Sequence, residues 1–405
     1  MQNWYRENID YKTLGLVLLL LFIGIVSIYS ATYDAGASAF FNRQLVWAAV
    51  GILVMLSVML VPFRMLQLFS YPLYAVSVLI LTGVLLIGKT VANSKSWFGV
   101  GGFGLQPSEI VKVGTILALA AFLSQRHVSL HRLKDVLKTF AIVLLPVTLI
   151  ILQPDMGTAI IYLGMLLLLL YWSGASRFLI LTLLAPIGAA LAALSGITPF
   201  VIVIALTLIA LFMVHENRFL SAIVFSLTVL VGVSVQFMFG KLAPYQQNRI
   251  LTFINPDVDP LGAGYNVIQS KIAIGSGGLF GKGYLQGSQT QLNFIPAQWT
   301  DFIYCVPSEE FGFLGAFVIL LLLTLLLWRG VQIASQVKNR YASIVAIGVV
   351  STLAVHILIN IGMSMGMIPV IGVPLPFLSY GGSNLLTNMI MVGLLLNMYA
   401  NRKEY

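Results

Sequence analysis

The chain has 405 residues, of which 59% are hydrophobic and only 9% are charged. A water-soluble domain carries about 25% charged residues, so this composition excludes a soluble fold and predicts a membrane protein. The net charge of +9 does not indicate a nucleic-acid partner, because the lysines and arginines are scattered singly through short loops.

Twelve apolar segments, each close to the length of a membrane-spanning helix, follow one another along the chain. They cover residues 14–32, 44–61, 71–88, 107–124, 139–153, 157–173, 178–195, 197–214, 219–239, 309–328, 342–364 and 384–400. Lipid offers no partner to free backbone groups, so the sequence predicts an all-α polytopic bundle forming one membrane domain, residues 1–405. We expect the first segment to be a retained helix, since its polar, charged start is unlike a signal peptide.

Lysines and arginines predict the orientation of this bundle. Fourteen fall in loops on one side and seven on the other, so the first side should face the cytoplasm together with both chain ends. The long loop 240–308 then faces outward, and its many aromatic and aliphatic residues argue against a disordered linker. Within this loop, residues 267–274 have the pattern of a short helix lying on the membrane.

Polar side chains within or beside the spans are the candidate functional residues, because such groups are costly in lipid. Glu109 and Lys112 stand three residues apart on one helix face. They either neutralise each other, or Lys112 binds an anionic headgroup. In the second case Glu109 modulates the charge of Lys112 or holds a cation. Asp155 either caps the next helix or joins the same site. His356, on one face with Asn360, is either bonded to a neighbour or functional.

These groups, with Arg43 and Trp97, lie at outer helix ends or beside the long loop. That placement predicts a site open to the outer leaflet rather than a path through the bilayer. Asp301 is the strongest catalytic candidate, because partial burial raises the pKa of a carboxylate toward the range of a general base. The alternative is an ordinary interfacial aspartate. Glu309 and Glu310 are candidates for capping the tenth span.

Two motifs resemble ligand sites without meeting their requirements. In GSGGLFGKG at 275–283, Ser276 stands where a phosphate loop needs its first glycine, and Gly283 replaces the serine or threonine after Lys282. NPDVDP at 255–260 contains an Asp-x-Asp pair, but its flanking prolines favour a plain turn. The single cysteine excludes an internal disulfide, and the spacing of His, Glu and Cys does not indicate zinc.

An ordered set of longer motifs resembles the SEDS family, which includes RodA and FtsW. The motifs are NRQLVW at 42–47, GLQPSEIVK at 104–112, ILQPDMGT at 151–158, DPLGAGYNVIQSKIAIGSGG at 259–278, QWTDFIYCVPSEEFGFLG at 298–315 and GVPLPFLSYGGSN at 372–384. The SKIAIGSGGLFGKG version and the IDY start are more similar to RodA than to FtsW. The resemblance implies a glycosyltransferase that polymerises lipid II into β-1,4 glycan strands and releases undecaprenyl diphosphate. The reaction would take place at the outer face of the cytoplasmic membrane during cell elongation.

The resemblance also implies partners and site residues. The partner is a class B penicillin-binding transpeptidase within the elongation machinery. Asp301 matches the family's essential acid, and Glu109 is the acid paired with the lysine of a lipid-phosphate cavity. The residues matched to that cavity or expected to contact substrate are Lys112, Asp155, Arg43, Trp97, Gln269, Ser270, Lys271, His356 and Ser379. A divalent cation, Mg or Mn, held near Glu109 or Asp155 is the only cofactor considered.

The chain departs from the family pattern in two places, and other functions stay open. The family commonly has ten spans, whereas two further apolar segments lie here between Asp155 and Tyr245. Ser96 stands where relatives commonly carry arginine, which leaves Lys95 as a substitute. The open alternatives are a flippase for lipid-linked precursors, a non-catalytic scaffold for the transpeptidase, and a division-specific, FtsW-like polymerase.

Overall fold

The computed structural model describes residues 9–34, 36–91, 94–100, 103–214, 217–241, 247, 264–296 and 298–403. The Asp-x-Asp pair within 255–260 lies outside these residues. The internal contacts divide the chain into two compact units. The first comprises Met1–Leu169 with Asn266–Tyr405, and the second comprises Leu170–Tyr265.

Helices make up most of both units. The long helices up to the second unit are α2 (Tyr11–Tyr33), α3 (Ser38–Met59), α5 (Ser70–Ile87), α6 (Pro107–Leu123), α7 (Leu133–Ile151) and α8 (Met156–Trp172). Those that follow are α9 (Arg177–Ser195), α10 (Ile197–Val214), α11 (Arg218–Phe239), α16 (Gly312–Gln336), α17 (Arg340–Ser364) and α18 (Gly382–Ala400). The shorter helices are α4 (Phe63–Leu68), α13 (Tyr265–Ser276), α14 (Ser288–Gln291) and α15 (Cys305–Glu310).

Each of the twelve predicted spans coincides with one of these twelve long helices. Eight of them are long and apolar enough to cross a membrane. The fold class of a helical membrane protein is therefore confirmed, whereas crossing by α6, α7, α8 and α18 stays a prediction. α6, which carries Glu109 and Lys112, has 17 residues, one fewer than the shortest of the eight helices that are long and apolar enough to cross.

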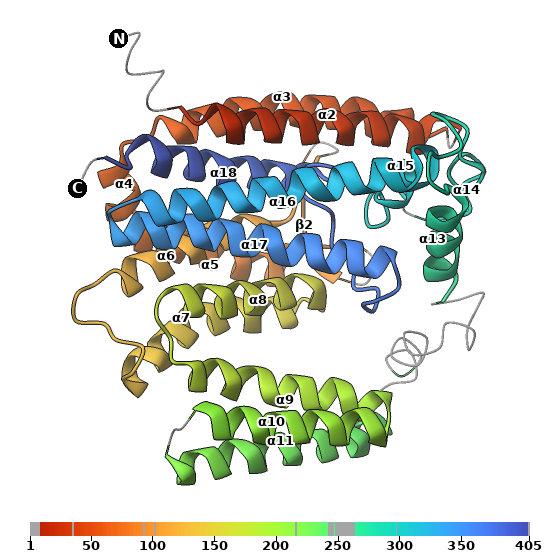
Figure 1. The fold of residues 1–405 in the computed structure, drawn as a ribbon. Coiled ribbons are helices and arrows are strands. Elements are labelled where there is room, and N and C mark those ends of the chain that lie inside the picture. The colour runs from red at the N-terminus through yellow and green to blue at the C-terminus, as the bar shows by residue number, and fades with distance from the viewer. Residues whose placement is uncertain are drawn as a thin grey trace. The chain divides into compact units, whose positions relative to one another are not determined.

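Helix α17 is the central helix of the first unit. It packs against α16, α6 and α18, and α18 in turn packs along α3 (Figure 1). The apolar side chains of α17 are distributed all round the helix, as expected for a helix enclosed by neighbours. Its C-terminal half also buries His356 and Asn360, which are both fully enclosed. A buried polar side chain needs a hydrogen-bond partner, so these two residues mark where α17 contacts the candidate site.

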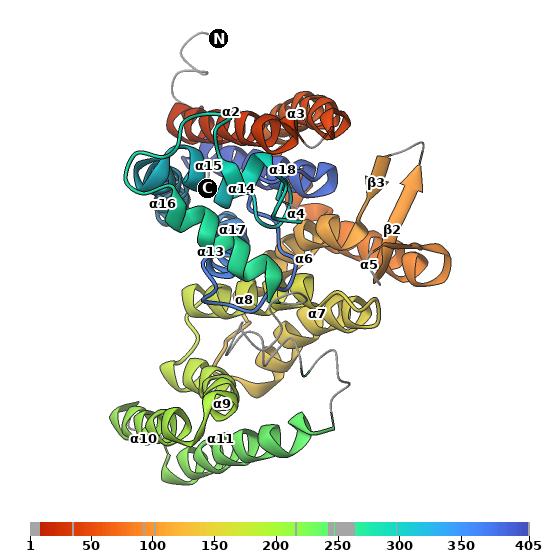
Figure 2. The same cartoon turned by 90° about the vertical axis from the view of Figure 1, so that its right-hand side faces the viewer.

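A small antiparallel sheet lies between α5 and α6, where the sequence predicted only a loop. Its strands are β1 (Lys89–Val91), β2 (Ser94–Val100) and β3 (Phe103–Leu105), paired in that order. Trp97 lies opposite Lys89, and Gly99 lies opposite Gly104. Strands this short give a weak pattern, although valine and aromatic residues favour them. Figure 2 shows β2 and β3 beside α5.

The loop after the second unit folds back on itself through two buried glutamates. Glu309 accepts hydrogen bonds from Lys282 Nζ at 2.7 Å and from backbone N–H groups at the start of α14. Glu310 accepts from the Ser30 hydroxyl of α2. Burial alone would raise the pKa of Glu309, but Lys282 and the α14 donors lower it below its ordinary value. The predicted capping of the tenth span by Glu309 and Glu310 is wrong, because both carboxylates bind the loop and α2 instead.

Helices α9, α10 and α11 form the second unit. Helix α9 packs against both α10 and α11, and Phe200 of α10 lies against Gly232 of α11. The Ser176 hydroxyl caps the start of α9 by accepting from the Leu179 N–H at 3.1 Å. These three helices lie in the range between Asp155 and Tyr245, where the sequence predicted two apolar segments beyond the family's usual ten. The expected single membrane domain stays a prediction.

Candidate functional site

The backbone at Asp301 is fixed by hydrogen bonds to consecutive carbonyl groups. The carbonyl oxygens of residues 299–301 accept, in order, from Tyr380 N at 2.8 Å, Ser379 Oγ at 2.6 Å and Asn360 Nδ2 at 2.8 Å. Two of these donors belong to the segment before α18, and Asn360 belongs to α17. Segments far apart in the sequence thus hold Asp301 in one position.

The Asp301 carboxylate is left open by the same arrangement. Among the described residues, no hydrogen-bond donor or cation reaches its oxygens. Burial raises the pKa of Asp301 from its ordinary value of 3.8 to about 6. Gly372, with φ +70°, brings its backbone close to the carboxylate, and a Cβ atom there would lie 3.5 Å from Asp301 Oδ2. A partly buried, unpaired carboxylate of raised pKa is suited to accepting a proton near neutral pH.

Helix α17 also holds the segment that begins at Gly372. Asn360 Nδ2 donates to the Val373 carbonyl oxygen at 2.7 Å, and His356 Nδ1 lies 3.2 Å from the Pro374 carbonyl oxygen. A carbonyl oxygen can only accept, so Nδ1 carries the imidazole proton and Nε2 is left as an acceptor. One face of α17 therefore fixes both the segment around Asp301 and the loop beside it.

Lys112 of α6 is the donor to His356 Nε2. Its Nζ lies 2.9 Å from that nitrogen and 2.8 Å from Glu109 Oε2. Asn384 Nδ2 donates to the same Glu109 oxygen at 3.0 Å, and Asn388 donates to Asn384 at 2.8 Å. The ion pair predicted from the spacing is present, and His356 is bonded to neighbours. The enclosed ammonium group of Lys112 has no free face in this conformation, so phosphate binding by Lys112 stays a prediction.

Asp155 caps α8 and is tied to the same region. Its Oδ1 accepts from the Thr158 N–H at 3.1 Å, which confirms the capping alternative. Its Oδ2 accepts from the Thr158 hydroxyl and from Gln106 Nε2, both at 2.8 Å. Burial raises the pKa of Asp155, although the Thr158 hydrogen bonds oppose the effect. Gln106 N donates to Ser383 Oγ at 2.9 Å, so Asp155 is linked to the start of α18.

Helix α13 borders the site from the long loop, and a helix over the predicted 267–274 segment is confirmed. Ser270 is buried and donates to the Ser364 carbonyl oxygen at 2.5 Å, which gives it a structural contact. Lys271 is exposed, and its side chain lies over Gly366, where a Cβ atom would come within 2.8 Å of Nζ. Gln269 is partly buried. Residues 366–372 thus have Lys271 at one end and Asp301 at the other.

Arg43 lies in the first turns of α3, whose neighbouring residues contact the site. Phe40, one helical turn earlier, stacks on Trp299 with ring centroids 5.2 Å apart and meets Tyr380 edge-on at 4.9 Å. Arg43 itself is exposed and forms no ion pair with a described residue. Trp97 packs on Gly104 in the hairpin. Arg43 and Lys271 therefore lie on helices that contact the segments around Asp301, and neither forms an ion pair with a described residue.

Position 96, where this chain has serine and its relatives commonly have arginine, lies on strand β2. Ser96 is buried, whereas the side chain of Lys95 lies outside the described residues. Substitution of Lys95 for the family's arginine stays a prediction.

The predicted divalent cation finds no preformed set of ligands in the described part of the chain. It holds no group of three or more His, Cys, Asp or Glu side chains placed to bind a metal ion. The oxygens of Glu109 and Asp155 already accept from Lys112, Asn384, Gln106 and Thr158. Neither carboxylate presents a free pair of oxygens, so we assign no step to a metal.

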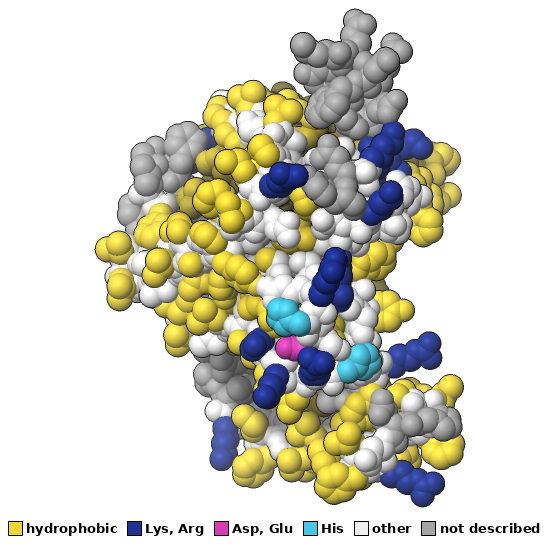
Figure 3. Space-filling view, turned by 90° about the vertical axis from the view of Figure 1, so that its left-hand side faces the viewer, with side chains coloured by type: hydrophobic (Ala, Val, Ile, Leu, Met, Phe, Trp, Pro, Cys, Tyr) yellow, Lys and Arg dark blue, Asp and Glu magenta, His cyan; other side chains and the backbone are white. Residues whose placement is uncertain are grey.

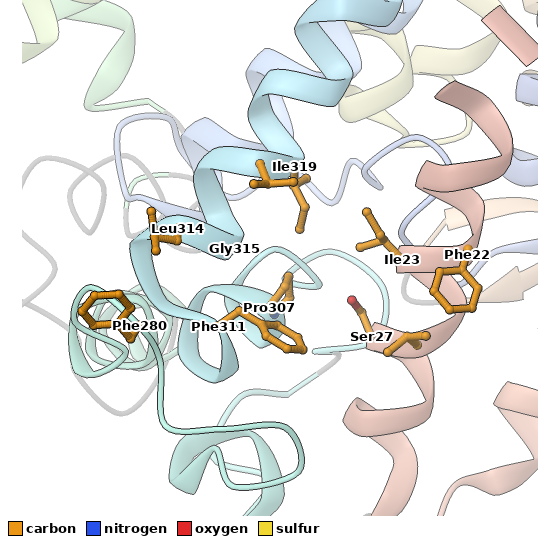
Figure 4. A pocket seen from close by; sticks show the side chains of 11 residues that line it. Phe22, Ile23, Ser27, Phe280, Pro307, Phe311, Leu314, Gly315 and Ile319 are labelled. Carbon is orange, nitrogen blue, oxygen red and sulfur yellow. The ribbon is translucent and has the colours of Figure 1, made fainter. Parts of the chain in front are cut away.

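A separate apolar pocket of about 440 Å³ lies between α2, α15 and α16. Its lining includes Phe22, Ile23, Phe280, Phe311 and Leu314. Figure 4 shows the Ser27 hydroxyl among these apolar side chains. None of the charged residues of the candidate site is part of this lining, so the pocket does not supply the chemistry considered above.

Sequence reasoning missed several polar side chains that connect the site. Three are amides and one is a hydroxyl, and each is part of the network around Glu109 and Asp155: Gln106, Asn384, Asn388 and Ser383. One signal was available, because Asn384 and Asn388 stand four residues apart in an apolar helix and therefore share a face.

Comparison with known proteins identifies the family. Residues 11–203 and 194–404 match the FtsW/RodA/SpoVE family, described as "Cell cycle protein". The chain belongs to this family. It is the SEDS family that the motifs resemble, so that prediction is confirmed.

Relatives in the SEDS family match nearly the whole chain. The peptidoglycan glycosyltransferase RodA of Treponema pallidum is 37% identical, with 98% of each chain covered. Stage V sporulation protein E of Bacillus subtilis is 36% identical, with 97% of each covered. The peptidoglycan glycosyltransferase MrdB of Escherichia coli is 33% identical, covering 99% of this chain and 96% of MrdB.

Solved structures of SEDS proteins show the same fold. A chain of a peptidoglycan synthase complex, described as coordinating polymerization and crosslinking, aligns with a TM-score of 0.75 and 27% identity. The alignment covers 98% of this chain and 99% of that one. RodA of Thermus thermophilus aligns with a TM-score of 0.65 and 26% identity over 98% of each chain.

Proposed function

We propose that this chain is a peptidoglycan glycosyltransferase that polymerises lipid II into β-1,4 glycan strands. The names of its SEDS relatives support this activity. The observation that carries the proposal is the Asp301 site. Three hydrogen-bonded carbonyl groups hold the backbone there, while the carboxylate has a raised pKa and no bound donor.

The reaction is an inverting displacement at the anomeric carbon of the donor strand. The acceptor sugar hydroxyl oxygen forms the new bond to that carbon as the bond from the carbon to the diphosphate oxygen breaks. Asp301 takes the hydroxyl proton, and the electron pair leaves with undecaprenyl diphosphate. General-base catalysis of this kind contributes about 10²–10⁴ in rate. Its efficiency is highest when the pKa of the base lies near the working pH, as the value of about 6 for Asp301 does.

The departing diphosphate needs positive charge, and Arg43 and Lys271 are the residues we assign to it. Both are exposed, and both lie beside segments that adjoin Asp301. Positive charge beside the departing diphosphate stabilises the negative charge that develops in the transition state. Lys112 and Glu109 take a positioning role, because they hold His356 and through it the segment at Pro374.

We also propose that the site faces outward, that both chain ends are cytoplasmic, and that the membrane is the cytoplasmic one. The distribution of lysine and arginine supports this orientation. A class B penicillin-binding transpeptidase is the proposed partner, by analogy with the synthase complex whose chain shares this fold. The similarity to RodA and MrdB favours elongation over division. Trp97, Gln269 and Asp155 are the remaining proposed contacts with lipid II.

The test is glycan-chain formation from fluorescent lipid II by the purified protein with its transpeptidase partner. Moenomycin is added to silence conventional polymerases. We expect long chains from the wild type and none from Asp301→Asn, which is nearly isosteric but cannot act as a base. Asp34→Asn, at an exposed acid, is the matched control and should keep full activity. A folded wild type without chains would favour a flippase or scaffold, and active Asp301→Asn would refute the base assignment.

A further inference from the structure

The turn between α6 and α7 forms a basic surface at the end of α6 away from Glu109. Its four cations are exposed, and two exposed histidines lie between them: Arg126, His127, His131, Arg132, Lys134 and Lys138. We call residues 126–138 the basic turn. Figure 3 shows lysine, arginine and histidine side chains gathered around a single acidic side chain on this face.

The basic turn contains a single acid, Asp135, against four cations, so it keeps a net positive charge. Asp135 is buried, and its Oδ2 accepts from the Ser129 N–H at 3.0 Å. Val128 and Leu130 are buried as well and anchor the turn against the unit. None of the four cations forms an ion pair with a residue that the structure describes. The turn therefore has a fixed shape with unbalanced positive charge on its outer side.

Exposed leucines stand directly beside these cations. Leu133 is 73% exposed and Leu137 is 59% exposed, four residues apart on one face of α7. The apolar surface continues along the helix to Leu144 and Leu145, which are also exposed. An apolar stripe that ends among lysines and arginines is typical of a helix at the boundary between acyl chains and headgroups.

We propose that the basic turn binds the headgroups of anionic phospholipids, with Leu133 and Leu137 inserted among the acyl chains. Charge complementarity selects the anionic headgroup, since clusters of four or more cations next to a membrane helix attract acidic lipids. Leu133 and Leu137 favour a lipid surface over an acidic protein or nucleic acid, because binding to either of those would not require large exposed apolar side chains beside the cations. This site lies apart from Asp301 and does not depend on the polymerase activity.

The experiment titrates the purified full-length protein in a zwitterionic detergent with fluorescent phosphatidylglycerol and, separately, with fluorescent phosphatidylcholine. We expect tighter binding of phosphatidylglycerol, weakened by added salt because exposed charges are screened. The test variant combines Arg132→Gln, Lys134→Gln and Lys138→Gln. A lysine or arginine near an acidic membrane contributes about fivefold in affinity, so the triple change should weaken phosphatidylglycerol binding tenfold or more.

A matched control removes the same charge elsewhere, with Lys12→Gln, Lys338→Gln and Arg340→Gln, all at exposed positions. It should bind phosphatidylglycerol within twofold of the wild type. The test variant should keep the wild-type elution volume and unfolding midpoint, because its three side chains are exposed. Equal binding of both lipids, unchanged binding by the test variant, or an equal loss in the control would each overturn the proposal. Glycan polymerisation is not measured, so these outcomes are independent of the proposed function.

Discussion

Replacing Asp301 with asparagine should stabilise the protein while removing its activity. The pKa of about 6, against an ordinary value of 3.8, means that the folded state holds the charged carboxylate less favourably than the unfolded chain does. This cost is fully present above pH 6, declines as pH falls, and disappears once both states are protonated. One pH unit corresponds to about 1.4 kcal/mol, so the cost is at most about 3 kcal/mol at pH 7.5 and about 1 kcal/mol at pH 4.5.

The measurement compares unfolding midpoints of wild type and Asp301→Asn at these two pH values. Because Asp301 is only partly buried, solvent reduces the effect, and we expect the variant to gain about 1–2 kcal/mol more at pH 7.5 than at pH 4.5. The amide is neutral at both values, so the difference between them isolates the charge of the carboxylate. Asp34→Asn, at an exposed acid, should show no such difference. An equal or larger gain at pH 4.5 would refute the burial argument.

Three further predictions test the hydrogen bonds and ion pairs that hold the site and the long loop. Asn360→Ala leaves the carbonyl groups of Asp301 and Val373 without their donor. We expect the polymerisation rate to fall at least tenfold while the affinity for lipid II stays within twofold of the wild type. A loss of affinity alone would contradict this role. Glu109→Gln leaves the Lys112 charge buried and unpaired and should cost about 3–5 kcal/mol, whereas adding Lys112→Met should recover much of that loss in thermal unfolding. Glu309→Ala should lower the unfolding midpoint more than Lys282→Met, since Glu309 also holds α14; the reverse order would refute that role.

The helices could be predicted from the sequence because each apolar run has the length of a membrane span. The Glu109–Lys112 ion pair could also be predicted, since a spacing of three places two side chains on one helix face. The contact between Asn360 and Asp301 could not be predicted, because 59 residues separate them and only the packed fold brings them together. Glu309 and Glu310 were misassigned for the same reason, because their donors lie in α2 and in the loop 282–291. The β hairpin was missed because its strands have only three to seven residues.

The pH dependence of chain elongation tests the role of Asp301 most directly. A general base must be ionised to accept a proton, so the rate should rise with pH, reach half its maximum near the pKa of about 6, and stay level above pH 7. The assay follows fluorescent lipid II at saturating concentration between pH 4.5 and 8. A rate that is independent of pH across this range, or the same profile in Asp301→Asn, would contradict the account.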